Sequence, residues 1–246
     1  IAGLLWGVVL VWLAIGVGRE AENDYEPAGW PSDVAVVIHS FDGYVRYWDG
    51  MLYHWHKHTQ HLGPYPTVIS ATETLLPDHI PPGVTVLRTG PGTWAQRLRH
   101  VLSQLSHPYV LYLQEDAWLT APLRTAYMRR MAHLMKTQNL RSLKLQAHCQ
   151  HQPEHRNDFQ DPLWYTVTHQ PSLWQTEFLR ATLYDEQEAM AHELETNALL
   201  HRYPELEQTC QCAQTYTSYQ FPFVEVSRQG QLLPVGVRML ENLAWP

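Results

Sequence analysis

Two adjacent carboxylates follow a run of strand-forming residues near the middle of the chain. The stretch YVLYLQEDAWLTAP (109–122) begins with aromatic and branched apolar residues and turns polar at Gln114, Glu115 and Asp116. Carboxylates at the tip of a buried strand are suited to hold a divalent cation, which neutralises a phosphate group. The alternative is a solvated loop that simply ends the strand.

A further acidic residue follows the first strand-like run. The segment VAVVIH (34–39) is almost continuously apolar, as in a strand that is covered on both faces, and Asp42 comes just after it. In open parallel sheets, ligands bind beyond the carboxyl ends of the strands. We therefore expect Asp42, Glu115 and Asp116 to gather at one sheet edge, which favours a binding site over a solvated loop.

The elements that must position these residues alternate between strands and helices. Strands are predicted at 34–39, 66–70, 83–89 and 109–113, and amphipathic helices at 44–55 and 94–105. This order predicts an α/β fold with a mixed, mostly parallel sheet flanked by helices. The second half is less regular, with a strand at 142–146, a β-rich run in 163–174, two helices within 175–203 and a hairpin over 221–234 that turns at Gly230.

An apolar segment opens the chain. Residues 1–18 carry no charge and would reach roughly 27 Å as a helix, close to the hydrocarbon thickness of a bilayer. We expect a single-pass membrane anchor at 1–18, a polar linker at 19–32 and the globular domain at 33–246. A signal-like segment and a buried core helix are the alternatives, and the orientation in the membrane stays open.

Composition excludes some classes of function. The net charge of −7 argues against nucleic-acid binding, which needs clustered Lys and Arg. The three cysteines, Cys149, Cys210 and Cys212, form no disulfide framework or zinc pattern, so we interpret them as isolated thiols.

Five ordered segments carry a family resemblance over residues 34–240. They are VVIHSFDGY, TWAQRLRHVLSQLSHPYVLYLQEDAWLTAP, HQPSLWQTEFLRATL, MAHELETNALL and FPFVEVSRQGQLLPVGV. Together they resemble bacterial and viral sugar transferases of polysaccharide gene clusters, which have a GT-A-like (Rossmann-like) nucleotide-sugar-binding fold. The chain departs from the family pattern at Glu115, where Asp is usual, at His192, where Trp is usual, and at Gln231, where Lys is usual.

The resemblance implies a set of site residues. Those implied at the nucleotide-sugar site are Ser40, Phe41, Asp42, Arg97, Glu115 and Asp116. Among them, Asp116 with Glu115 would hold Mn²⁺ or Mg²⁺ on the diphosphate. Gln170 and Trp174 would shape the acceptor pocket, because aromatic faces suit sugar rings.

The resemblance also implies a general base that takes the proton of the acceptor hydroxyl. Glu193 is favoured over Glu195, and residues two apart on a helix do not face the same way. The alternative is that both are solvated charges of an acidic helix. Because no nucleophile stands out, we expect inversion at the transferred sugar.

The predicted function is a membrane-anchored glycosyltransferase that uses a nucleotide sugar, with UDP favoured, and a glycan or other hydroxyl acceptor. One alternative is a metal-dependent hydrolase built on the histidine and aspartate clusters, such as His54 and His58 at helical i, i+4 spacing. For these histidines we favour a surface position. The other alternative is a non-catalytic relative that binds a glycan or a nucleotide sugar.

Overall fold

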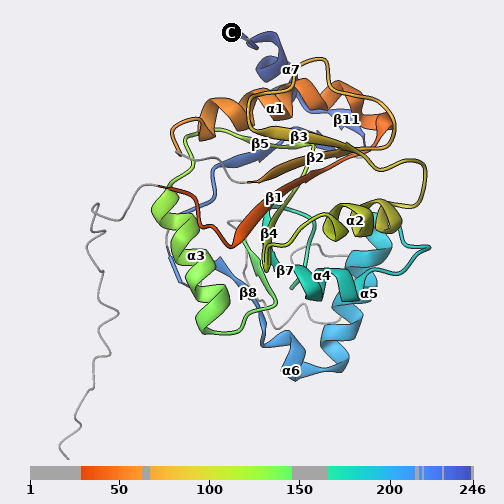
Figure 1. Ribbon diagram of the computed structural model, residues 1–246, viewed down its shortest axis with the longest axis vertical. Coiled ribbons are helices and arrows are strands. Elements are labelled where there is room, and N and C mark those ends of the chain that lie inside the picture. Colours follow the sequence, from red (N-terminus) through yellow and green to blue (C-terminus); the bar gives the residue numbers. More distant parts are fainter. Residues whose placement is uncertain are drawn as a thin grey trace, which may run out of the picture.

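The computed structural model describes residues 29–62, 67–145, 166–213, 216–217, 219–228 and 230–244. A seven-stranded sheet with the order β3-β2-β1-β4-β7-β6-β8 forms its centre (Figure 1). The strands are β1 (Val34–His39), β2 (Val68–Thr72), β3 (Val84–Arg88), β4 (Tyr109–Gln114), β6 (Ser142–Lys144), β7 (Ser172–Gln175) and β8 (Cys210–Cys212). Only β7 runs antiparallel to its neighbours, so the mixed, mostly parallel sheet is confirmed.

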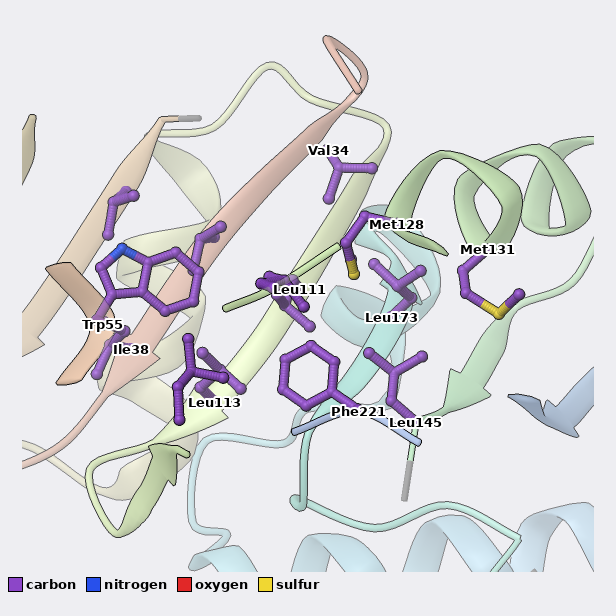
Figure 2. Packing of buried hydrophobic residues seen from close by; sticks show 14 of the residues in the cluster. Val34, Ile38, Trp55, Leu111, Leu113, Met128, Met131, Leu145, Leu173 and Phe221 are labelled. Carbon is purple, nitrogen blue, oxygen red and sulfur yellow. The ribbon is translucent and has the colours of Figure 1, made fainter. Parts of the chain in front are cut away.

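Helices cover both faces of this sheet. They are α1 (Val45–Thr59), α2 (Trp94–Ser103), α3 (Thr125–Thr137), α4 (Thr176–Thr182), α5 (Ala189–Arg202), α6 (Pro204–Glu207) and α7 (Pro234–Glu241). Successive side chains of β1 point to opposite faces, as the pleat requires. Val34 and Ile38 join the core under α1 and α3 (Figure 2), whereas Ala35 and Val37 join the core under α2, α4 and α5.

The predicted helix at 94–105 begins where its sequence signals a start. Thr93 is the N-cap: its hydroxyl accepts a hydrogen bond from the Gln96 amide, and the Gln96 side chain accepts one from the Thr93 amide. This reciprocal pair satisfies two of the amide groups that a helix start leaves unpaired. The buried stripe of Leu98, Val101 and Leu102 then fixes α2 against the sheet.

The C-terminal segment departs from the predicted hairpin over 221–234. A short hairpin does form between β10 (Ser227–Arg228) and β11 (Gln231–Leu232), with Gly230 in its turn at φ +73°. However, β9 (Phe223–Glu225) pairs with β5 (Ala117–Leu119), the short strand that follows β4. This long-range pairing brings the C-terminal segment to the acidic end of β4.

The histidines of α1 also differ from expectation. His54 and His58 are 8% and 9% exposed, so the surface position predicted for them is wrong. The ring of Trp118 from β5 stacks on His54 with 5.5 Å between the ring centroids. Trp118 can pack this closely because Gly50 has no side chain, and an added Cβ there would collide with its ring.

The predicted membrane localisation is contradicted. In the part of the chain that the structure describes, no helix has both the length and the apolar character needed to cross a bilayer. The predicted apolar helix at 1–18 lies outside the described residues. Among the cysteines, Cys210 is a buried free thiol, but Cys212 takes part in a disulfide, so the interpretation of isolated thiols is wrong for Cys212.

Candidate functional site

The two carboxylates at the end of β4 lie in the turn that connects β4 to β5. The Trp118 indole donates a hydrogen bond to the Glu115 carbonyl at 2.8 Å. The Val226 amide donates to the Asp116 carbonyl at 2.9 Å, and the Ser227 hydroxyl donates to Asp116 Oδ2 at 2.9 Å. The turn is therefore held at its backbone and at one carboxylate oxygen, unlike a solvated loop.

Burial changes the proton affinity of both acids. Burial, and then the negative charge of Asp116, raises the pKa of Glu115 to about 8. Burial also raises the pKa of Asp116, although the hydrogen bond from Ser227 opposes this rise. Two adjacent ionised carboxylates are unfavourable in such surroundings, and a bound cation would offset the cost.

A cavity of about 600 Å³ opens at the carboxyl edge of the parallel strands. Its wall combines the ends of β1 and β4, the starts of α2 and α5, the loop after β2, and the C-terminal segment. Contributions come from His39–Phe41, Glu73, Trp94, Arg97, Gln114–Asp116, Glu188–Met190, Glu225, Ser227 and Gly230. Ligand sites of open α/β sheets occupy this position.

The cavity wall is acidic. Among the described residues, five carboxylic acids line it, namely Glu73, Glu115, Asp116, Glu188 and Glu225, against the single guanidinium of Arg97. An anionic ligand would be repelled by this wall unless a cation accompanied it. Within the described residues, no group of three or more His, Cys, Asp and Glu side chains can hold a metal ion on its own. A cation in the cavity would therefore need further oxygen atoms from its ligand or from water.

Arg97 is the fixed positive charge of the wall. Its side chain is 7% exposed, it lies 3.5 Å from Glu73, and its guanidinium carbon lies 5.3 Å from the centre of the Phe41 ring. The neighbouring Ser40 is also held in place, because its hydroxyl accepts a hydrogen bond from the Trp48 indole at 2.8 Å. Arg97, Phe41 and Ser40 thus line the same cavity.

Asp42 is placed differently. It lies half-buried at the start of a 3-10 turn (Asp42–Tyr44) and accepts hydrogen bonds from the amides of Thr74 and Leu75 at 3.0 and 3.1 Å. Partial burial alone would raise its pKa, but these bonds and the Thr74 hydroxyl lower it overall. The structure thus engages Asp42 with the loop after β2, and this loop presents Glu73 to the cavity.

The two predicted base candidates diverge on α5. Glu193 accepts a hydrogen bond from the His169 amide, whereas Glu195 accepts one from the Gln187 side chain. Glu195 lines a separate pocket of about 260 Å³. The carboxylate that α5 brings to the large cavity is Glu188, the N-cap residue of the helix.

The predicted acceptor residues lie around β7. Gln170 is partly buried in the turn before this strand, and its carbonyl accepts a hydrogen bond from the Ser172 hydroxyl at 2.8 Å. Trp174 is 1% exposed and packs with Phe178 in the core under α2 and α4. Its ring face is therefore unavailable to an acceptor, and the prediction for Trp174 needs correction.

Buried imidazoles back the cavity wall. His169 Nε2 lies 2.9 Å from His192 Nδ1, and His192 Nε2 lies 2.9 Å from the Thr182 hydroxyl. The Trp94 ring covers both, with 4.4 Å between its centroid and that of His169. Burial lowers the pKa of His192 to about 4, so this pair is neutral near pH 7.

Several residues that line the cavity were not among the predicted site residues. Glu73 directly follows the second strand, so the argument that selected Asp42 would have selected it too. Glu225 and Ser227 carry no local signal, because only the pairing of β9 with β5 brings them to the cavity.

Comparisons with known proteins identify no family: no family model and no curated protein matches the chain. Among solved structures, residues 1–349 of S. aureus TarS match 68% of this chain at 13% identity and a TM-score of 0.43, and the chain spans only 55% of that fragment. Glucosyl-3-phosphoglycerate synthase from Mycobacterium tuberculosis, in complex with Mn²⁺ and UDP-glucose, matches 82% of this chain and 78% of its own, at 12% identity and a TM-score of 0.47. Likeness at this level establishes neither family membership nor activity.

Proposed function

We propose that the protein is a glycosyltransferase that moves a sugar from a nucleotide-sugar donor, with a UDP-sugar favoured, to the hydroxyl of a glycan or other acceptor. This proposal rests on one observation: an acidic turn and a guanidinium group line the same cavity. The turn of buried Glu115 and half-buried Asp116 and the buried Arg97 guanidinium both line it, at the carboxyl edge of the sheet. A diphosphate between them would meet a cation site on one side and a guanidinium on the other.

The acidic turn fits Mn²⁺ or Mg²⁺. Carboxylate oxygens are the ligands that both ions prefer, and one or two of them suffice when phosphate and water complete the coordination. Asp116, with Glu115 beside it, would hold the ion. When bound, the ion would supply the positive charge that stabilises a departing diphosphate.

The part of the cavity wall formed by Phe41 and Glu73 suits the nucleoside. Phe41 offers an aromatic face, while Glu73 offers acceptor oxygens for base N–H groups or ribose hydroxyls. We assign this role to Glu73 in place of Asp42, because Glu73 lines the cavity and Asp42 binds the loop that presents it.

For the acceptor base we favour Glu188 over Glu193 and Glu195. A base must come within hydrogen-bond reach of the hydroxyl that it deprotonates. Glu188 lines the cavity, whereas Glu193 is engaged with the His169 amide and Glu195 with Gln187. A base that activates the acceptor hydroxyl for direct attack on the sugar corresponds to transfer with inversion.

The proposal is tested by thermal-shift measurements with UDP-, GDP-, CMP- and dTDP-sugars, with and without Mn²⁺. We expect a metal-dependent rise in the unfolding temperature with one nucleotide, and its loss in Asp116→Asn. Asp33→Asn is the matched control, because Asp33 immediately precedes β1 at the opposite edge of the sheet. If no nucleotide stabilises the protein, the proposal fails. Binding without sugar transfer to any acceptor would identify the non-catalytic alternative.

A further inference from the structure

One oxygen of the Asp116 carboxylate accepts a hydrogen bond from a serine of the C-terminal segment. The Ser227 hydroxyl donates to Asp116 Oδ2 at 2.9 Å, across 111 residues of sequence. Ser227 is 5% exposed, so water competes little for this hydrogen bond. A buried hydroxyl that donates to a carboxylate restricts the rotation of that carboxylate about its last side-chain bond.

The backbone around Ser227 is fixed independently of this side chain. The preceding Val226 donates its amide to the Asp116 carbonyl at 2.9 Å, and its own carbonyl accepts from the Leu233 amide at 2.8 Å. Glu225 pairs with Ala117 in the ladder between β5 and β9. The Ser227 hydroxyl therefore keeps its position relative to Asp116 through main-chain contacts on both sides.

The geometry points to Ser227 as a positioning residue that makes Asp116 a one-oxygen ligand. We infer that Ser227 occupies Oδ2 and so presents Oδ1 of Asp116 to the divalent cation in the cavity. This inference rests on the proposed function, because it presupposes that a cation binds there. Groups that hold metal ligands in place typically change metal affinity by about 10- to 100-fold when removed.

The test is a titration of the full chain with Mn²⁺ in the presence of UDP, followed by the electron paramagnetic resonance signal of free Mn²⁺. We expect Ser227→Ala to bind Mn²⁺ about 10- to 100-fold more weakly than the wild type. Ser227→Thr keeps a hydroxyl and should retain most of the affinity. Ser172→Ala is the matched control: Ser172 is equally buried, at 2% exposed, and its hydroxyl donates at 2.8 Å to a backbone carbonyl instead of a carboxylate.

The outcomes separate this inference from the proposed function. If the wild type binds no Mn²⁺ with or without UDP, the cation site itself is absent and both fail. If the wild type binds and Ser227→Ala binds equally well, only the positioning role is overturned. It is also overturned if Ser172→Ala weakens binding as much as Ser227→Ala, or if a folded Ser227→Thr behaves like Ser227→Ala. Thermal unfolding of each variant establishes that it is folded.

Discussion

Arg97 lies 3.5 Å from Glu73, and both side chains line the same cavity. They come from different elements, since Glu73 follows β2 and Arg97 belongs to α2. The guanidinium is therefore paired before any ligand arrives, which reduces the cost of burying its charge. A diphosphate would gain a positioned, bidentate donor that needs little reordering.

Replacing Arg97 should weaken donor binding. We expect Arg97→Ala to raise the dissociation constant of the nucleotide by about 10- to 100-fold, because a hydrogen bond to a charged group contributes about 1.5–3 kcal/mol. Arg97→Lys should recover only part of this loss, since an ammonium group lacks the planar fork of a guanidinium. Calorimetric titration with the nucleotide and Mn²⁺ measures both. Equal affinity in all three proteins would remove Arg97 from the binding site.

A comparison of Glu188→Gln with Glu193→Gln should show which of the two glutamates is the general base. We expect Glu188→Gln to lower the turnover number by about 100- to 10,000-fold with unchanged donor affinity, as for loss of a general base. Glu193→Gln should keep most of the turnover, because a glutamine oxygen still accepts from the His169 amide. Single-turnover transfer assays with a competent acceptor measure the difference. The reverse pattern would assign the base to Glu193.

Glu115 should contribute a loss of stability to the metal-free protein as the pH rises from about 5 to 8. Burial and Asp116 raise the pKa of Glu115 to about 8, so the folded state keeps a proton that the unfolded state releases above its pKa of 4.5. From this group alone, the free energy of unfolding should fall in this window by roughly 1.4 kcal/mol per pH unit at most. The buried histidines, whose pKa values are lowered, act in the opposite sense at the acidic end of the window. Urea unfolding at pH 5, 6.5 and 8 compares the wild type with Glu115→Gln, and the stability of the wild type relative to the variant should decrease as the pH rises. A relative stability that stays constant or grows across the window would contradict the prediction.

Tyr47→Phe should loosen the C-terminal segment. The Tyr47 hydroxyl donates to the Gly230 carbonyl at 2.9 Å, and Arg46 contacts the same carbonyl. We expect a loss of about 0.5–1.5 kcal/mol in the free energy of unfolding and weaker Mn²⁺ binding. Tyr127→Phe is the control, because the buried Tyr127 hydroxyl has no hydrogen-bond partner among the residues that the structure describes, and its removal should cost little. If both variants lose the same free energy of unfolding, the hydrogen bond from Tyr47 to the Gly230 carbonyl does not specifically stabilise the C-terminal segment.

The sequence predicts those parts of the fold that rest on local patterns. The apolar run of β1 and the apolar stripe of α2 each carry their own periodicity, so their type and approximate bounds are readable. The carboxyl-edge argument correctly joins the end of β1 to Glu115 and Asp116, because β1 and β4 are adjacent and parallel.

What the sequence could not give depends on contacts between distant residues. Nothing near Asp42 reveals that its carboxylate binds the loop after β2 and leaves the cavity to Glu73. The helical spacing of Glu193 and Glu195 indicates that they diverge, but not which neighbour each one meets. The burial of His54 requires Trp118 to cover it, and Trp118 reaches that position only through the turn after β4.

The hydrogen bonds from Val226 and Ser227 to Asp116 also set an order of assembly during synthesis. A ribosome adds about 5–20 residues per second, so residue 227 leaves the tunnel roughly 6 to 20 s after residue 116, across the 111 positions between them. The strands β1 to β4 are complete during that interval, while the acidic turn still lacks its partners. The ribosome would therefore synthesise β1 to β4 well before the residues that hold the proposed cation site in place, and a chain interrupted in between would lack the hydrogen bonds from Val226 and Ser227 to Asp116.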